Sequence, residues 1–426
     1  MEARPWWSRP GLEVHGGRLT IAGRDAEQVA REHGTPLYVH DLVRVEEQAR
    51  ALQTALRESG LRGQVRLALK AQRESQVLRF VRALGPPGSP QAVGMDVCSP
   101  GEIDWALDHG WLPDEISYTG TNCSDRDLDR VLESEVHLTV DLCTQLDRVG
   151  RRAPGSTVGI RVNPRIGAGF EGGSRTLYSG DRPTKFGIFA EQLPEALGVA
   201  RRHDLTIDTV HFHTGDGYLS DGLPVFEEAV RRVGAMAELL IGEGCPIKEV
   251  NTGGGLGVPQ RAGQAPLDLR AWADILADHL RPLDVVVGTE PGDFLTKECA
   301  IHLAEVVTVE QRDGERFVGL DTGWNVMPEH FIYGALLDLV LCRAADAAPT
   351  DRVVISGNIN EGDDLFARDH PFPDVEEGDI VAAIGVGSYN ASMTSPHCLR
   401  GPAKAVFFDD RIQADRAAAP AAFRLS

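Results

Sequence analysis

The chain has 426 residues, a length that predicts two domains, and its contents of 42% hydrophobic and 25% charged residues are typical of a soluble globular protein. Its 63 acidic and 43 basic residues give a net charge of −20, which disfavours binding to nucleic acid and to anionic membranes. We expect no membrane association, because the N-terminus lacks the apolar core of a signal peptide and no stretch has the apolar length of a membrane span.

Residues 1–35 predict a short strand and a helix. GRLTIAG (17–23) alternates between glycines, as a strand does, and DAEQVAREHG (25–34) has helical spacing and ends at a glycine. We expect this N-terminal strand to join a β domain that lies further along the chain.

Residues 36–300 form a repeating pattern in which short apolar runs alternate with amphipathic helical stretches. The candidate strands are PLYVH, VRLALK, GMDVCS, EISYTG, HLTVD, TVGIRVN, TVHFH, EVNTGGG and DVVVGTEPG. About eight strand–helix units predict a closed (β/α)8 TIM-like barrel. A doubly wound open sheet is the alternative, although no GxGxxG follows the first strand.

Residues 301–426 have a different pattern. AIHLAEVVTVEQRDGERFVGLD predicts a hairpin with its turn at DG, and RVVISG, GDIVAAIG and KAVFFDDR predict further strands joined by Pro- and Gly-rich loops. The fold class is therefore α/β, with a barrel at 36–300 and a second, all-β domain at 301–426.

Several candidate barrel strands end in polar residues or glycines, where the chemistry of such barrels collects. These are Lys70, Asp96, His211, His213, the glycines at 253–255, and Glu290. Desolvation at the end of VRLALK would lower the pKa of Lys70, and its neutral amine could then form a Schiff base with a carbonyl group. A lysine that merely extends to solvent is the alternative.

The other strand ends suggest a flat, phosphorylated cofactor. VNTGGGLGV allows backbone N–H groups to approach a phosphate but lacks the GK[ST] of a P-loop, and a tight barrel loop is the alternative. HFH could bind zinc, but no third ligand is evident, so an imidazole against an aromatic cofactor fits better. Glu290 could bond a protonated ring nitrogen or be a solvated turn acid. Together with Lys70, these features suggest pyridoxal phosphate and no metal.

Longer motifs carry a resemblance to a known family. TPLYVHD, LALKAQ, GMDVCSPGEI, RVNP, TKFGI, HFHTGDG, NTGGGLGVP and EPG occur in this order, followed by LDTGWN, NEGDD and GVGSYNASM. In these motifs the chain resembles the fold-type III pyridoxal-phosphate-dependent decarboxylases, the family of diaminopimelate decarboxylase and eukaryotic ornithine decarboxylase. The resemblance implies an alanine racemase-like fold. It also implies a homodimer in which the NEGDD-like segment of each subunit completes the active site of the other.

The resemblance assigns roles to individual residues. Lys70 would bond the cofactor aldehyde, His213 would stack on its ring, and Glu290 would pair with the ring nitrogen. The other cofactor-binding positions would be Asp96, Asp216, Gly254, Gly255 and Tyr389. The remaining catalytic and substrate-pocket candidates are Asp293, Glu329, Tyr333, Asn360, Glu361 and His397.

Four positions depart from the family pattern. Asn360 replaces a cysteine, Asp216 replaces the serine of HxGS, and Asp293 and Glu329 replace arginines. Two acids in place of arginines predict repulsion of a distal carboxylate and a preference for a basic side chain. Alternatively the acids point away from the substrate or pair with other side chains, and Arg368 and Arg400 are candidates for such pairing.

The leading hypothesis is decarboxylation of a small-molecule amino acid with a basic or unusual side chain. Alternatives are meso-diaminopimelate, a modified or carrier-linked amino acid of secondary metabolism, an amino-acid racemase, or a non-catalytic pyridoxal-phosphate-binding protein. Glu290 argues against the racemase, and the long C-terminal domain argues against the non-catalytic pyridoxal-phosphate-binding protein.

Seven scattered cysteines, none arranged as CxxC, predict free thiols in a reducing cytoplasm.

Overall fold

The structure is a computed structural model that describes residues 5–169 and 183–409. The chain divides into two compact units. The first, here called the β unit, comprises Met1–Glu47, Gln260–Gln264 and Thr296–Ser426, and the second, the barrel unit, comprises Gln48–Pro259 and Ala265–Leu295.

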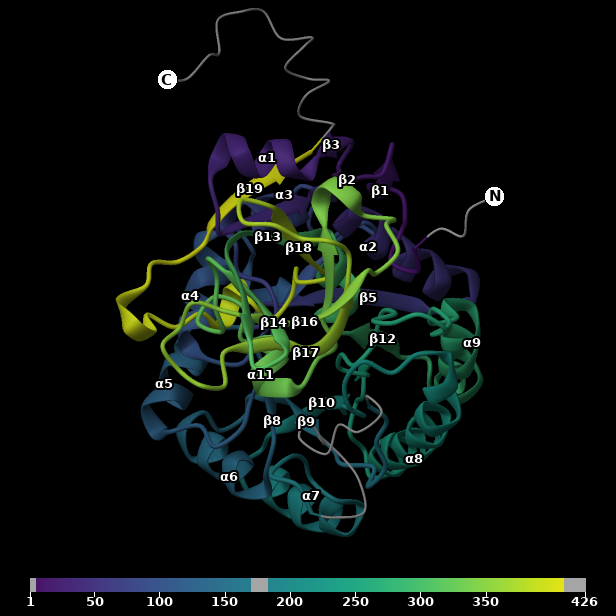
Figure 1. Cartoon of the computed structure of the whole chain (residues 1–426). Helices are drawn as coiled ribbons and strands as arrows, with labels where there is room; N and C mark the ends of the chain where they lie inside the picture. Colours follow the sequence, from purple (N-terminus) through teal and green to yellow (C-terminus); the bar gives the residue numbers. More distant parts are fainter. Residues whose placement is uncertain (1–4, 170–182, 410–426) are drawn as a thin grey trace, which may run out of the picture. The chain divides into compact units, whose positions relative to one another are not determined.

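The barrel unit is built around a closed parallel barrel, as the sequence pattern predicts (Figure 1). Around the barrel the strand order is β10-β11-β12-β5-β6-β7-β8-β9, and every neighbouring pair is parallel. The strands are β5 (Arg62–Ala68), β6 (Gly94–Val97), β7 (Ile116–Gly120), β8 (His137–Val140), β9 (Thr157–Arg161), β10 (Thr206–His211), β11 (Glu249–Asn251) and β12 (Val286–Thr289).

Helices follow the barrel strands and surround them (Figure 1). They are α2 (Leu42–Glu58), α3 (Ser75–Arg82), α4 (Pro100–Asp108), α5 (Asp125–Glu133), α6 (Cys143–Arg152), α7 (Leu193–Arg202), α8 (Leu223–Gly242), α9 (Leu269–Leu280) and the short α10 (Asp293–Thr296). The beginning of α2, up to Glu47, belongs to the β unit. The sequence sets where α4 begins: Ser99 caps it by accepting a 3.2 Å hydrogen bond from the Glu102 backbone, and Glu102 accepts one of 2.8 Å from the Cys98 backbone.

The β unit contains two sheets. The strands β1 (Leu12–His15), β2 (Arg18–Ile21) and β3 (Arg24–Asp25) form a three-stranded antiparallel sheet, which α1 (Ala26–His33) follows. An eight-stranded mixed sheet contains β4 (Leu37–Asp41), β13 (Ala300–Arg312), β14 (Glu315–Leu320), β15 (Asp338–Leu341), β16 (Asp351–Ser356), β17 (Leu365–Phe372), β18 (Ile380–Ile384) and β19 (Lys404–Phe408). The helix α11 (Glu329–Tyr333) lies between β14 and β15 in the chain.

The long strand β13 organises the mixed sheet. Its first residues pair with β4, where Ile301 lies opposite Val39, and its last residues form the expected hairpin with β14, where Val309 lies opposite Val318. Two apolar clusters stabilise the unit. Leu37 and Ile301 contribute to one cluster, together with residues of β1 and β2, and Val306, Val318 and other residues contribute to the second.

One prediction about the N-terminal region is wrong. PLYVH was expected to open the barrel, but β4 lies in the mixed sheet between β13 and β19. All five residues of β4 are buried, so its unbroken apolar run fits a central strand of either sheet equally well. Residues 18–21 of the strand expected at 17–23 form β2 of the small sheet, which belongs to the β unit. The β unit accordingly extends to Glu47, beyond the boundary expected at residue 35.

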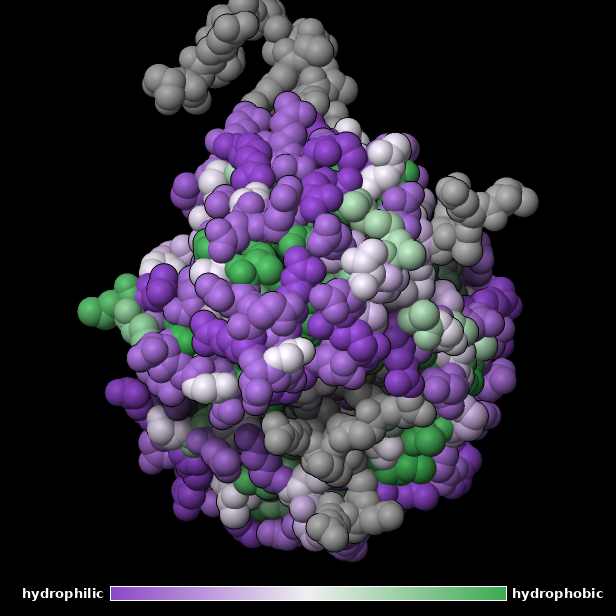
Figure 2. Space-filling model, viewed as in Figure 1, coloured by the Kyte–Doolittle hydropathy of each residue, from purple (hydrophilic) through white to green (hydrophobic). Residues whose placement is uncertain are grey.

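The surface is mainly polar. Figure 2 shows hydrophilic side chains over most of the visible face, in keeping with the net charge of −20. Within the residues that the structure describes, no helix has the length and apolar content that crossing a bilayer would require.

Candidate active site

Lys70 and Asp96 meet at the carboxyl end of the barrel, as the positions of their strands predict. Lys70 lies two residues beyond β5, and its Nζ is 3.5 Å from Oδ2 of Asp96 on β6. The Asp96 side chain is 4% exposed, whereas that of Lys70 is 39% exposed. Burial raises the pKa of Asp96 to about 7, and the charge of Glu290 adds to this effect while Lys70 opposes it. The lysine amine therefore lies at an accessible position beside a buried carboxyl group.

Glu290 is buried at the end of β12 and is bound through both of its oxygens. Oε2 lies 3.0 Å from His211 Nε2, and Oε1 accepts a 2.6 Å hydrogen bond from Asn251 Nδ2. Burial alone would raise the pKa of Glu290, but His211, Arg66 and Asn251 together outweigh this effect and lower the pKa. Glu290 is therefore an anion held in one orientation, as a partner for a protonated ring nitrogen must be.

The glycine turn after β11 packs too closely for side chains. A Cβ on Gly254 would lie 2.7 Å from the Glu290 carbonyl oxygen, and one on Gly255, where φ is +93°, would lie 2.3 Å from the Gly215 carbonyl oxygen. Among the described residues, the N–H groups of Gly254 and Gly255 have no hydrogen-bond acceptor. Free backbone donors in a tight glycine turn suit a phosphate group.

His213 is an uncharged imidazole at the mouth of the barrel. Burial, with help from the charges of Arg161 and Lys70, lowers its pKa well below the usual value. Its Nδ1 accepts a 3.2 Å hydrogen bond from the Gly215 backbone, which places the ring proton on Nε2. A neutral ring of fixed tautomer can lie against an aromatic cofactor without placing a charge on it.

Zinc ligation by the HFH motif finds no support in the part of the chain that the structure describes. No group of three or more His, Cys, Asp or Glu side chains there could hold a metal ion. His211 is instead directed at Glu290, whereas the backbone fixes the His213 ring.

The barrel unit therefore meets the requirements of pyridoxal phosphate. Lys70 could supply the amine, Glu290 an anion for the pyridine nitrogen, and Gly254 and Gly255 the backbone donors for the phosphate. When bound, this cofactor withdraws the electrons of the substrate bond that breaks. Two other candidates, Asp216 and Asp293, lie in this unit, in the loop after β10 and at the start of α10.

The other predicted residues lie in the β unit, where Glu329 has an unexpected partner. Lys297 donates a hydrogen bond to Glu329 Oε1, and both side chains are buried. Asn390 donates a 3.0 Å hydrogen bond to the second oxygen of Glu329 and accepts one of 3.2 Å from its backbone. Neither Arg368 nor Arg400 is this partner. Sequence reasoning missed Lys297, although an isolated lysine in FLTKECAI is a signal that could have revealed it.

Tyr333 and Tyr389 lie against each other in the β unit. Their rings pack edge to face, with centroids 6.0 Å apart at an interplanar angle of 88°. Tyr389 has φ of +53°, a left-handed conformation that is uncommon for a residue other than glycine and is typical of functional positions.

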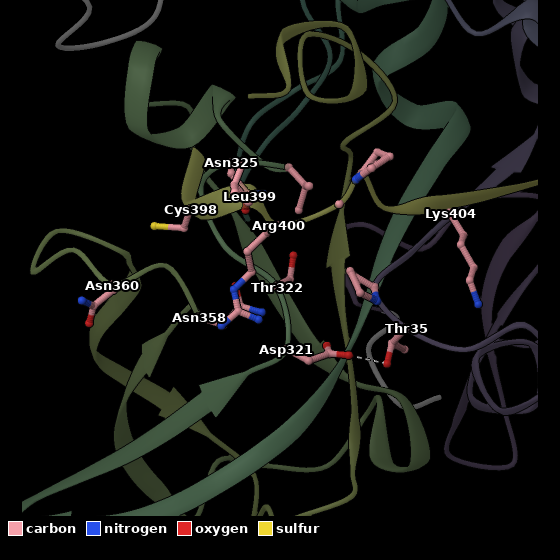
Figure 3. Close-up of a pocket in the computed structure, with 14 residues that line it drawn as sticks. Thr35, Asp321, Thr322, Asn325, Asn358, Asn360, Cys398, Leu399, Arg400 and Lys404 are labelled. Carbon is pink, nitrogen blue, oxygen red and sulfur yellow. Dashed lines mark hydrogen bonds between the residues drawn. The ribbon is translucent and has the colours of Figure 1, made fainter. Parts of the chain in front are cut away.

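Glu361 and His397 also meet within the β unit. His397 Nε2 lies 3.1 Å from Glu361 Oε1, and the His397 ring stacks on Trp324 with a centroid distance of 5.0 Å. Asn360 is exposed and lines one edge of a cavity of about 600 Å³, which is also lined by Asp321 and Arg400 (Figure 3). The structure thus brings Glu361 and His397 into contact, while Asn360 lies beside them on the surface.

Comparison with known families gives the decisive observation. Residues 42–297 match the family described as "Pyridoxal-dependent decarboxylase, pyridoxal binding domain". The chain belongs to the pyridoxal-dependent decarboxylases. It is a carboxy-lyase that uses pyridoxal phosphate to decarboxylate an amino acid, and its fold is the barrel and separate mixed sheet of the alanine racemase-like class.

Individual relatives cover nearly the whole chain. The diaminopimelate decarboxylase of Methanothermobacter thermautotrophicus is 32% identical, and the match covers 91% of this chain and 90% of the relative. That of Streptomyces coelicolor is also 32% identical, with 91% and 86% covered. The crystal structure of diaminopimelate decarboxylase from Helicobacter pylori complexed with L-lysine superposes with a TM-score of 0.80 at 26% identity, covering 90% of this chain and 94% of that one.

Proposed function

We propose that this decarboxylase acts on an amino acid whose distal end is cationic or neutral rather than a carboxylate. The single observation that carries the proposal is the buried pair of Lys297 and Glu329. The resemblance places substrate-binding arginines at positions 293 and 329, where this chain has acids. Because Lys297 is engaged by Glu329, its charge is not available to replace those arginines.

The pair also changes the expectation drawn from the sequence. Two acids at these positions would favour a basic substrate strongly, but Lys297 cancels the charge of Glu329 and so weakens that preference. A cationic distal group therefore fits, and so does a neutral one such as an amide or a carrier-linked group. A distal carboxylate gains no cationic partner from the acids at positions 293 and 329.

We propose the following roles for the residues of the barrel unit. Lys70 would bind the cofactor aldehyde, and its amine would be able to return a proton to the substrate carbon. His213 would pack against the cofactor ring, Glu290 would hold a proton on the ring nitrogen, and the N–H groups of Gly254 and Gly255 would bind the phosphate.

Glu361 and His397, with Asn360 beside them, are proposed to act in the active site of a second subunit of a homodimer. Their exposure in the single chain supports this proposal, because the side chains of His397 and Glu361 are 40% and 54% exposed.

All seven cysteines lie within the described residues and are free thiols, which supports a reducing compartment such as the cytoplasm.

meso-Diaminopimelate is the second candidate substrate, because relatives at 32% identity are named diaminopimelate decarboxylases. The two proposals are separated by CO2 release from the purified holoenzyme, offered L- and D-lysine, L- and D-ornithine, arginine and meso-diaminopimelate in turn. Release from a basic amino acid at a higher kcat/KM than from meso-diaminopimelate supports the first. The reverse order rejects it.

A further inference from the structure

His211 is a buried imidazole for which the reaction described so far has no use. It ends β10, and its side chain is 2% exposed. The neighbouring strands β11 and β12 carry Asn251, which lies directly opposite His211 in the register, and Glu290, which follows the last residue of β12. Three adjacent strands thus place an imidazole, an amide and a carboxylate at the same end of the barrel.

We propose that His211 and Asn251 are positioning residues that fix the carboxylate of Glu290 in the orientation required to meet the ring nitrogen of the cofactor. This inference rests on the role proposed above for Glu290. It assigns His211 neither to metal binding nor to direct contact with the substrate.

The hydrogen bonds define the position of the carboxylate completely. Asn251 Nδ2 donates to Oε1 at 2.6 Å, and His211 Nε2 lies 3.0 Å from Oε2, so the carboxylate cannot rotate without losing a partner. The amide of Asn251 is itself oriented, because its Oδ1 accepts a 3.0 Å hydrogen bond from the Gly253 backbone. The backbone N–H of Glu290 donates to the Gly253 carbonyl at 2.7 Å. The acid and the glycine turn therefore form one rigid unit.

The second ring nitrogen of His211 indicates that the contact between His211 and Glu290 serves the active site rather than core packing. Nδ1 is buried and has no hydrogen-bond partner among the described residues, so Glu290 is the one polar group that holds the ring. A buried polar atom without a partner opposes folding, and an apolar side chain here would avoid that penalty. Core packing alone does not account for an imidazole at this position, whereas orientation of Glu290 does.

Arg66 contributes charge from deeper in the barrel. Its guanidinium binds both oxygens of Glu249, at 2.6 and 3.0 Å, and its field acts on Glu290 as well. Arg66 therefore helps keep Glu290 ionised but does not orient it. His211 and Asn251 orient the Glu290 carboxylate. Mutation of these two residues therefore tests orientation separately from the effect of the Arg66 charge.

The experiment compares the wild-type holoenzyme with His211→Phe, His211→Gln and Asn251→Ser. Phe removes the donor, Gln offers an amide N–H in place of Nε2, and Ser removes the donor to Oε1. The matched control is His302→Phe, which removes a buried imidazole of the β unit that bonds Thr322 at 2.9 Å. For each variant we would record the absorption spectrum of bound pyridoxal phosphate, its dissociation constant, kcat and KM, and the thermal unfolding midpoint.

The proposal predicts that His211→Phe and Asn251→Ser alter the cofactor spectrum and lower kcat by about 10- to 100-fold, the usual effect of losing a residue that orients a group at an active centre, with KM nearly unchanged. His211→Gln should recover most of both signals, and His302→Phe should leave both unchanged. If the His211→Phe and Asn251→Ser spectra match that of the wild type while cofactor is bound, the proposal is overturned. The spectrum does not depend on the substrate, so failure of the proposed substrate class would leave this test intact.

Discussion

Lys297 and Glu329, 32 residues apart in the sequence, form a buried ion pair within the β unit. Asn390 completes the pair by binding the second carboxylate oxygen. A lysine and a glutamate that neutralise each other present no net charge at a position where the family resemblance places a cationic arginine. Glu329 is one of the four positions at which the chain departs from the family pattern.

Breaking the ion pair should destabilise the protein more than removing it. Lys297→Met leaves a buried carboxylate without its cation, which we expect to lower the free energy of unfolding by about 3–5 kcal/mol. The double variant Lys297→Met/Glu329→Leu should recover most of that loss. Urea unfolding of the apoenzyme measures both values, and additive losses in the double variant would show that the two side chains do not interact.

Replacing Lys70 should abolish covalent attachment of the cofactor. Borohydride reduction of the holoenzyme should fix pyridoxal phosphate to a peptide containing Lys70, and Lys70→Ala should show no fixed cofactor and a loss of activity of about 1,000-fold or more. The matched control is Lys248→Ala, which removes a largely exposed lysine of the same unit. Cofactor fixed to any other lysine in Lys70→Ala would contradict the assignment.

Asp96 should make the apoenzyme less stable as the pH rises. Its pKa is about 7 in the folded protein and about 4 in the unfolded chain, so between these values the folded state binds more protons. The free energy of unfolding should therefore fall between pH 4 and pH 7, and Asp96→Asn should remove up to about 1.4 kcal/mol per pH unit of this slope, or about 4 kcal/mol over the range. Denaturant unfolding at several pH values tests this, with Asp104→Asn as an exposed control that should follow the wild-type curve.

Complementation tests the proposed sharing of sites between subunits. Lys70→Ala and Glu361→Ala should each be inactive alone. Unfolding and refolding them together in equal amounts should restore about a quarter of wild-type activity, because half of the dimers are mixed and each mixed dimer contains one intact site. Activity that stays at zero after mixing, with dimers confirmed by light scattering, would place Glu361 in the site of its own subunit or outside any site.

The barrel and its reactive end could be predicted from the sequence for a physical reason. Parallel strands that close into a barrel bring their carboxyl ends together, so Lys70, Asp96 and Glu290 had to converge once their strands were recognised. The partner of Glu329 could not be predicted in this way. Lys297 begins a short 3-10 helix and Glu329 begins α11, so their contact depends on tertiary packing of irregular segments, for which no periodic pattern exists.

The position of β4 shows a second limit. Its residues are buried on both faces whether the strand belongs to the barrel or to the middle of a mixed sheet, so its composition is the same in either case. Only the pairing with β13 and β19, more than 250 residues further along the chain, distinguishes the two possibilities.

The central claim is that the Lys297–Glu329 pair turns the enzyme away from a distal carboxylate. The most direct test is the ratio of kcat/KM for meso-diaminopimelate to that for L-lysine, measured in the wild type and in Lys297→Ala/Glu329→Arg. Because position 329 is proposed to contact the distal group of the substrate, we expect the unpaired guanidinium of the double variant to raise this ratio by at least about tenfold. A ratio that does not change, in a variant that still binds cofactor and unfolds cooperatively, would show that this pair does not select the substrate.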